Sequence, residues 1–143
     1  MITIRECRIS DYVKIYELNK NAFGYEYPLS KTRERLLGIL KRPTDKLFVA
    51  CIEEKVAGYI HGSDYECTYS ESLKNIIAIA VDEEYRCMGI GRKLIEEVEK
   101  WAKECGCCGV RLVSGFDRTD AHEFYLHCGY KNRKQQKNFI KFF

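Results

Sequence analysis

The sequence has few of the residues that interrupt a fold: it contains 2 prolines in 143 residues, and its 10 glycines nowhere gather into a linker. It also lacks a long apolar run, because the longest, residues 76–81, is far shorter than the ~20 residues needed to cross a bilayer. The first residues alternate apolar and polar side chains and do not resemble a secretory signal. We therefore expect one soluble, cytoplasmic domain spanning residues 1–143, with no membrane partner.

The sequence has no large excess of charge of either sign. Its 24 Lys and Arg residues nearly balance its 21 Asp and Glu residues, which leaves a formal net charge of +3. A nucleic-acid-binding domain of this size usually carries a denser basic surplus, so we expect no nucleic-acid partner. Hydrophobic residues make up 45% of the chain and charged residues 31%, a balance that is typical of globular proteins and argues against disorder.

Cysteine, in contrast, is abundant, with eight residues in the chain. Most of them lie within apolar segments, and no secretory signal precedes them. We therefore interpret them as reduced thiols packed as small hydrophobic side chains, and not as a disulfide scaffold. Residues 105–108 contain a C-x-x-C spacing, but no second pair of ligands accompanies it, so we expect no metal site. A redox role for Cys105, Cys107 and Cys108 stays open.

The spacing of apolar residues predicts the order strand, two helices, three strands, helix, strand, helix and two final strands. The expected strands are residues 1–7, 46–52, 56–62, 75–81 and 110–113, with two more within 130–143. The expected helices run from a cap at residues 10–11 to 21, from 30 to 43, from 91 to about 105, and from 120 to 128. This order predicts an α/β fold: one mixed, mostly antiparallel sheet with helices on both faces. The nearly all-apolar segment 75–81 is typical of a central strand.

The junction that follows this strand carries the sharpest local motif, Arg86-Cys87-Met88-Gly89-Ile90-Gly91. Two glycines let the backbone bend so that successive N–H groups converge, and the first helical turn adds unpaired N–H groups and a positive dipole end. This pattern predicts a cradle for a phosphate or pyrophosphate. It is neither a Walker loop nor a dinucleotide fingerprint, whose third glycine would stand where Leu94 is. On the glycines alone, a tight strand-to-helix turn is an equally good interpretation.

In its context, Arg-x-x-Gly-x-Gly resembles the acyl-CoA pyrophosphate loop of the GNAT superfamily of N-acetyltransferases. A second block, residues 121–130, reads A-H-E-F-Y-L-H-C-G-Y and resembles the A-x-x-F-Y-x-x-x-G-[FY] helix of that family. The resemblance covers essentially the whole chain. Within the family, the chain is similar to small bacterial members, among them relatives of aminoglycoside 6′-N-acetyltransferases. It implies a GNAT-like fold, acetyl-CoA as co-substrate, and direct transfer of the acetyl group to a primary amine.

The same resemblance implies roles for particular residues. The pyrophosphate would be held by the loop and the first turn of the helix, that is by Arg86, Cys87, Met88, Gly89, Ile90, Gly91 and Arg92. The backbone of Ile79, Ala80 and Val81 would pair with the pantetheine arm, and an N–H at Ile79 or Ala80 would polarise the thioester carbonyl. Tyr125 matches the tyrosine beside the CoA sulfur and would protonate the departing thiolate. The helical pattern without the resemblance favours another interpretation, in which Tyr125 is a packed aromatic side chain.

The sequence does not identify the residue that acts as the general base. Many relatives carry a glutamate at the start of the strand before the loop, and Asn75 stands at that position here. The candidates are Glu26 and His61, with Glu66 and Glu71 as further carboxylates. For each carboxylate a solvated surface charge is the simpler interpretation. For His61, a hydrogen-bonded histidine at a strand end is an equally good one.

The aromatic and acidic residues of segments 25–27 and 65–71 favour a small cationic acceptor, polyamine-like or aminoglycoside-like, over a protein lysine or N-terminus. Two other functions stay open. One is a non-catalytic acyl-CoA-binding or sensing module. The other is an acyltransferase with a covalent intermediate on Cys87, although a bound pyrophosphate would repel its thiolate. The apolar chain end, residues 139–143, slightly favours a homodimer.

Overall fold

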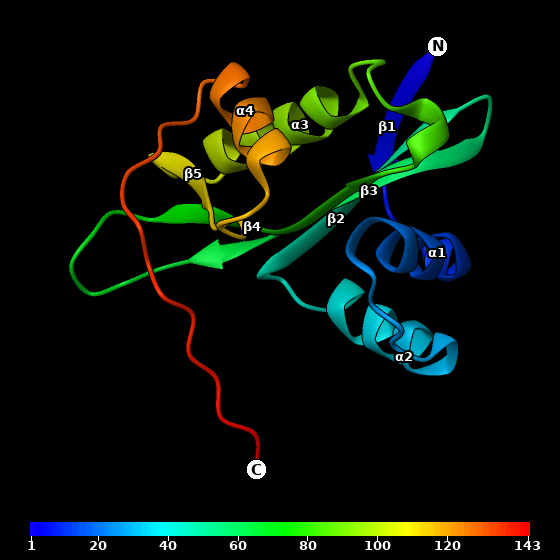
Figure 1. The fold of residues 1–143 in the computed structure, drawn as a ribbon, viewed down its shortest axis with the longest axis horizontal. Coiled ribbons are helices and arrows are strands. Elements are labelled where there is room, and N and C mark those ends of the chain that lie inside the picture. Colours follow the sequence, from blue (N-terminus) through cyan, green and yellow to red (C-terminus); the bar gives the residue numbers. More distant parts are fainter. The chain divides into compact units, whose positions relative to one another are not determined.

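The computed structural model describes every residue from Met1 to Phe143. Its strands are β1 (Ile2–Glu6), β2 (Asp45–Ile52), β3 (Lys55–Tyr65), β4 (Leu73–Val81) and β5 (Gly109–Leu112). Its α-helices are α1 (Tyr12–Phe23), α2 (Leu29–Leu40), α3 (Ile90–Glu104) and α4 (Thr119–His127), and two 3-10 helices are η1 (Ile9–Asp11) and η2 (Glu83–Tyr85) (Figure 1). The chain forms two compact units, Met1–Leu112 and Val113–Phe143. A single domain over residues 1–143 stays a prediction.

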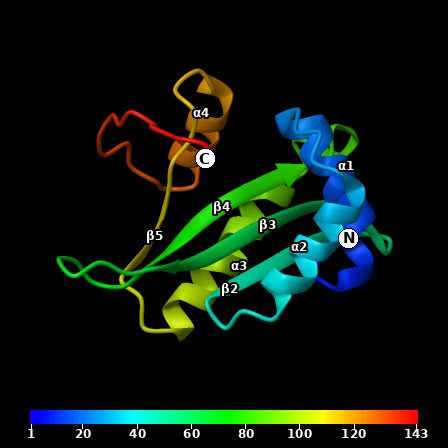
Figure 2. The same ribbon diagram turned by 90° about the horizontal axis from the view of Figure 1, so that it is seen from below.

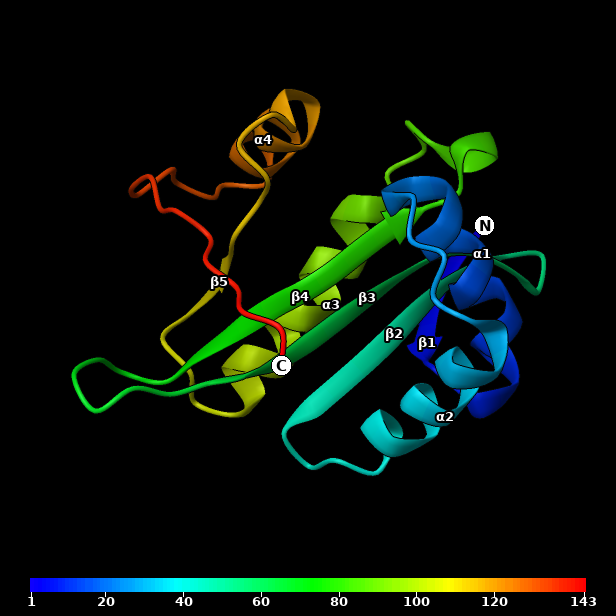
Figure 3. The same ribbon diagram turned by 60° about the horizontal axis from the view of Figure 1, so that its bottom comes forward.

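The first unit is built on one five-stranded sheet in the order β1-β2-β3-β4-β5. Strands β1 to β4 pair with one another in antiparallel fashion, and β5 runs parallel to β4 (Figure 3). Short polar turns join β2 to β3, whereas β4 reaches its parallel neighbour through α3, as a parallel crossover requires. The predicted α/β architecture with a mixed, mostly antiparallel sheet is confirmed.

Alternation along β3 defines the two faces of the sheet. Gly58 and Gly62 point toward α3, because a Cβ atom on Gly62 would lie 3.1 Å from the Trp101 ring of that helix. Tyr59 points to the opposite face and donates its hydroxyl hydrogen to Asn19 Oδ1 of α1. We call these the α3 face and the α1–α2 face (Figure 2). Helices therefore cover both faces, as predicted.

Each face buries its own apolar side chains. On the α3 face, the predicted helical stripe of Leu94, Val98 and Trp101 is buried against the sheet. On the α1–α2 face, Ile15 and Leu18 of α1 pack with residues of β2, β3 and α2. None of the helices is long and apolar enough to span a membrane.

The second unit contains α4 and a C-terminal segment without strands. The prediction of two strands within residues 130–143 is wrong: these residues form no regular secondary structure, and all of 131–143 are exposed. Their apolar side chains are highly exposed, at 87% for Phe139, 76% for Ile140 and 83% for Phe142. An alternating pattern states only which side chains share a face, whereas a strand also needs a neighbour to pair with, and this chain supplies none.

Candidate functional site

The loop between β4 and α3 turns through two residues with left-handed backbone. Cys87 has φ 64°, and Gly89, the N-cap of α3, has φ 83°. A left-handed residue among right-handed ones turns successive N–H groups toward one side, which is the geometry of an anion-binding nest. Arg86, Cys87, Met88 and Gly89 are all exposed, so a ligand can reach this part of the backbone.

The start of α3 is anchored closely against the sheet. Its first residue, Ile90, is 1% exposed. A Cβ atom on Gly58 would lie 2.9 Å from the Ala80 carbonyl oxygen and 3.3 Å from Ile90 Cγ2, so the absence of a side chain there permits the close approach. No acidic residue lies in the first turn of α3. The unpaired N–H groups and the positive dipole end of the helix are therefore available to an anionic ligand.

Asp82 ties this junction to α1. Its Oδ1 accepts a hydrogen bond from the Glu84 N–H at 3.0 Å, and its Oδ2 accepts one from Lys14 Nζ at 2.7 Å. The hydrogen bond from Lys14 and that from the Glu84 backbone lower the pKa of Asp82, so the carboxylate stays charged and the loop keeps both connections at neutral pH.

The outer edge of β4 is open beyond residue 76. β5 pairs with β4 only over Leu73–Ile76, whereas β3 pairs with it as far as Val81 (Figure 3). The N–H of Asp82 donates to the Ala57 carbonyl at 2.8 Å. Because backbone groups alternate in direction along a strand, the N–H groups of Ile79 and Val81 point to the open edge, and that of Ala80 points toward β3. An extended ligand can pair with this edge as an added strand.

The edge and the nest are consecutive along the chain, so residues 79–92 form one continuous polar track. The ten residues expected to bind a cofactor all lie on this track. The N–H groups of Ile79 and Ala80 are the two candidates for polarising the thioester carbonyl. Because the Ile79 N–H points to the open edge and the Ala80 N–H points toward β3, the backbone direction favours Ile79.

His61 lies on β3 and points to the α1–α2 face. It is 8% exposed, and its Nε2 lies 2.7 Å from Asp45 Oδ2. Burial alone would raise the pKa of Asp45, but hydrogen bonds from Thr44 and His61 outweigh it and hold that pKa below its usual value. The contact between Nε2 and the Asp45 carboxylate fixes the orientation of the ring, and Nδ1 is the other ring nitrogen.

The candidate carboxylates are all exposed and differ in their partners. Glu26 lies between α1 and α2 beside the exposed rings of Tyr25 and Tyr27. Glu66 accepts a hydrogen bond from Ser72 Oγ at 3.0 Å. No hydrogen bond or ion pair joins Glu26 to His61, so these two candidate bases are independent of each other.

Tyr125 lies on α4 in the second unit. Its ring contacts those of Phe124, with centroids 5.4 Å apart, and Tyr130, at 6.4 Å. Burial raises the pKa of Tyr125, so its hydroxyl keeps its proton at neutral pH.

A cluster of three side chains on the α1–α2 face was missed by the sequence analysis. The guanidinium of Arg111 on β5 lies 4.2 Å from the centroid of the Tyr65 ring, and its Nη1 donates to Asn75 Oδ1 at 2.7 Å. The signal in the sequence is a lone charge within the short apolar strand V-R-L-V, at residues 110–113. Periodicity cannot show that Asn75 and Tyr65 come to the same place.

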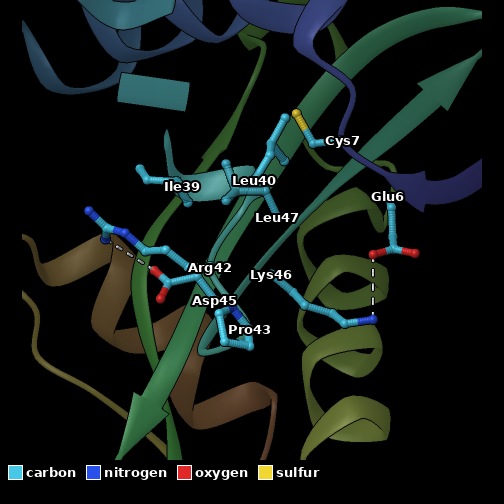
Figure 4. Close-up of a pocket in the computed structure, with 9 residues that line it drawn as sticks. All are labelled: Glu6, Cys7, Ile39, Leu40, Arg42, Pro43, Asp45, Lys46 and Leu47. Carbon is cyan, nitrogen blue, oxygen red and sulfur yellow. Dashed lines mark ion pairs between the residues drawn. The ribbon is translucent and has the colours of Figure 1, made fainter. Parts of the chain in front are cut away.

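A partly open cavity of about 170 Å³ lies elsewhere in the first unit, between the end of α2 and the start of β2 (Figure 4). Leu40, Asp45 and Leu47 are among its lining residues. It contains none of the residues expected to bind or react, so the candidate site is the open track along β4 and not this cavity.

The sequence profile described as the acetyltransferase (GNAT) family matches residues 12–130. An uncharacterized N-acetyltransferase of Methanocaldococcus jannaschii is 30% identical over 132 residues, which cover 92% of this chain and 79% of the relative. An N-alpha-acetyltransferase of Sulfurisphaera tokodaii is 28% identical over 145 residues, covering 95% of this chain and 84% of the relative.

A solved structure has a similar fold. The crystal structure of an aminoglycoside acetyltransferase from an uncultured soil metagenomic sample, in complex with trehalose, is 26% identical, with a TM-score of 0.84. The similarity covers 99% of this chain and 96% of that one.

Proposed function

Because the chain belongs to the GNAT family of acetyltransferases, we propose that it transfers an acetyl group from acetyl-CoA to the primary amine of a small molecule. It is an acyltransferase, and its family uses acyl-CoA donors. The observation that carries the proposal is the continuous track from the open edge of β4 to the nest before α3. Its length and chemistry suit a ligand with an extended, amide-containing arm and a pyrophosphate at one end.

In this proposal the nest and the first turn of α3 hold the pyrophosphate. The backbone N–H groups of residues 87–92 donate to its oxygens, and Arg86 adds positive charge. Ile79 and Val81 pair with the pantetheine arm. The Ile79 N–H donates to the thioester carbonyl, and a donor aimed at a developing oxyanion typically contributes about 3 kcal/mol to transition-state stabilisation.

Proton transfer is assigned to side chains. An amine is protonated at neutral pH and must lose a proton before its nitrogen can attack the thioester carbon. His61 is our first candidate for accepting that proton, through water, since Asp45 fixes its ring; Glu26 is the second. As the C–N bond forms and the C–S bond breaks, Tyr125 gives its proton to the departing thiolate. This assignment needs no covalent intermediate on Cys87.

The acceptor is proposed as a small amine that is cationic at neutral pH. The exposed rings of Tyr25 and Tyr27 around Glu26 favour such a group. The relative from the soil metagenome is described as an aminoglycoside acetyltransferase, and this description supports a small molecule as the acceptor. A second candidate is the N-terminal amine of a peptide, which the name of the Sulfurisphaera tokodaii relative favours.

The test is a screen of purified protein with acetyl-CoA and a panel of polyamines, aminoglycosides, amino acids and short peptides, with release of free CoA thiol as the readout. We expect thiol release that requires an amine, with the acetylated amine seen by mass spectrometry. CoA binding without release for any amine would contradict the proposal and support the sensing module.

A further inference from the structure

Among the lysine and arginine side chains of this protein that are buried or half-buried, Arg111 alone has no carboxylate partner. The other lysine and arginine side chains that are not exposed all form ion pairs: Arg5 with Asp11, Lys14 with Asp82, Lys46 with Glu6, and Lys74 with Asp64. Enclosing a charge is costly unless it is paired and hydrogen-bonded. The half-buried guanidinium of Arg111 is therefore a candidate partner for an anion from outside the chain.

The groups around Arg111 hold it without neutralising it. The amide of Asn75 accepts from Nη1, and the Tyr65 ring carries the guanidinium on its face, but both are uncharged. Nε is buried and has no hydrogen-bond acceptor. The guanidinium is thus oriented and only partly satisfied. A planar fork of this kind matches a carboxylate or a phosphate, and in the proposed function the pyrophosphate of the donor is held at the nest.

The strand register locates this cation on the α1–α2 face. Ser63 of β3 pairs with Asn75 of β4, which pairs with Arg111 of β5, and Ser63 shares its face with His61 and Tyr59. Lys74, the neighbour of Asn75 on β4, lies 4.1 Å from the Trp101 ring centroid on the opposite face, as alternation requires.

The cation also lies next to the point where the two strands part. Ile76 and Leu112 form the last pair between β4 and β5, one position beyond Asn75 and Arg111. The register shift between His61 and Gly62 leaves Ile77 out of the pairing, and its side chain is 53% exposed. Arg111 therefore borders the open edge on the face that also carries His61.

We propose that Arg111 is the anion-recognition residue of the acceptor site, and that the acceptor carries a carboxylate at the end remote from its amine. This inference rests on the proposed function, in which the acetyl group is transferred near the Ile79 N–H. Because Ile77 is bulged out, Asn75 and Ile79 pair with Ser63 and Ile60, three positions apart on β3, which is about 10 Å along the sheet. An extended tripeptide spans about 10 Å, so an amine and a carboxylate separated by that length fit the two ends.

The proposal narrows the acceptor class. A polyamine would place a second positive charge near Arg111 and be repelled by it. A short peptide with a free carboxylate, or a long amino acid with its amine and carboxylate at opposite ends, satisfies both the cationic amine and the anionic end. These two kinds of acceptor share the same end groups, an amine and a carboxylate. They differ in whether the chain between the two ends contains peptide bonds.

The experiment compares glycine, diglycine, triglycine and tetraglycine with their C-terminal amides as acceptors, and 8-aminooctanoate with its amide. We expect kcat/KM for the acid to exceed that of the amide by about 10-fold at tripeptide length, since a hydrogen bond to a charged group contributes on that order. If the activity on 8-aminooctanoate equals that on triglycine, the acceptor site recognises the two ends of the acceptor and not its peptide bonds. In the variant Arg111→Gln the preference for the acid over the amide should disappear, mainly because KM for the acid rises. The control variant Lys100→Gln, on the exposed side of α3, should keep this preference.

Asn75→Asp provides a second test, because it places a carboxylate next to the guanidinium. It should lower the preference for acids although Arg111 is retained. Equal rates on acids and amides at every length, unchanged in Arg111→Gln, would overturn the inference and leave the proposed function intact.

A binding measurement makes the inference independent of turnover. N-acetyl-triglycine and its amide are titrated into the protein saturated with CoA. Tighter binding of the acid to the wild type than to Arg111→Gln supports the inference even if no amine is acetylated, in which case the proposed function alone fails. Equal binding of acid and amide, or equal binding to both proteins, contradicts it.

Discussion

Tyr125 is the residue on which the proposed chemistry depends most. A phenol can protonate a thiolate only if it still carries its proton, and burial raises the pKa of Tyr125 and so keeps it protonated at neutral pH. The same burial fits a packed aromatic side chain, since the ring contacts Phe124 and Tyr130. The two roles differ in what the hydroxyl does.

Replacing Tyr125 with phenylalanine removes the hydroxyl and keeps the ring. We expect kcat to fall about 100-fold, in the range of general-acid contributions, with little change in the Kd of acetyl-CoA. Steady-state kinetics and a calorimetric titration measure the two effects. Tyr16→Phe, on α1, is the matched control. A Tyr125→Phe enzyme with wild-type kcat, when chemistry limits the rate, would return Tyr125 to the packing role.

At the scale of elements, the start of α1 is fastened to β1 by a charged pair. Both oxygens of Asp11 accept hydrogen bonds from Arg5 at 2.9 Å, and Oδ2 also accepts one from the Arg8 N–H at 2.8 Å. Burial alone would raise the pKa of Asp11, but these hydrogen bonds hold it below its usual 3.8. A lowered pKa in the folded state means that the charged form stabilises the fold.

We predict that Asp11→Asn lowers the free energy of unfolding at pH 7 by about 2 kcal/mol, because it leaves Arg5 without its partner. The carboxylate contributes fully above its unfolded pKa of 3.8 and loses its contribution as the pH falls through the lower folded value. The difference between wild type and variant should therefore be constant from pH 7 to 5 and shrink below pH 4. Urea unfolding at several pH values measures it, and a difference that grew with acidity would contradict this explanation.

Elements with a strong periodic pattern could be predicted from the sequence. The stripe of Leu94, Val98 and Trp101 identified α3 and its buried side. The apolar segment 75–81 identified a strand, β4, but its prediction as a central strand covered on both faces is only partly right, because β5 pairs with β4 no further than Ile76 and Ile77 is 53% exposed. These patterns report how many sides of an element are covered. The Arg86–Gly91 motif marked the junction between the two elements, and the structure gives that junction left-handed backbone at Cys87 and Gly89.

Features that depend on pairing between distant segments could not be predicted. The two final strands are absent because alternation does not supply a partner strand. The contact of Arg111 with Tyr65 and Asn75 depends on a register between β3, β4 and β5 that no local pattern contains. His61 was a candidate from its residue type, but its orientation by Asp45, sixteen residues away, emerges only from the fold.

At the scale of the whole molecule, the C-terminal segment leaves its apolar side chains uncovered. Phe139, Ile140, Phe142 and Phe143 are each at least 76% exposed, on a segment without strand pairing. An unpaired segment of this composition is suited to pairing with another chain. A second copy of this protein is the partner that we propose.

We predict a homodimer whose formation depends on this segment. Sedimentation velocity across micromolar concentrations should show a concentration-dependent shift above the 16.8 kDa monomer. Phe142→Lys should abolish the shift, whereas Lys141→Gln should retain it. A single monomeric species at every concentration would rule out the dimer.

We propose that the junction between β4 and α3 binds the pyrophosphate of CoA, and a substitution of Gly89 tests this binding directly. Gly89 and Gly106 both have positive φ, at 83° and 74°, and a Cβ atom on either would meet nothing within 4 Å. Alanine at either position therefore costs a similar backbone strain of about 1–2 kcal/mol. Only Gly89 belongs to the nest, and Gly106 follows the other end of α3.

The measurement is a calorimetric titration of CoA into the wild type, Gly89→Ala and Gly106→Ala, each shown to be folded. We expect at least 10-fold weaker binding for Gly89→Ala and wild-type affinity for Gly106→Ala. Equal affinity of Gly89→Ala and wild type, or an equal loss in both variants, would contradict it.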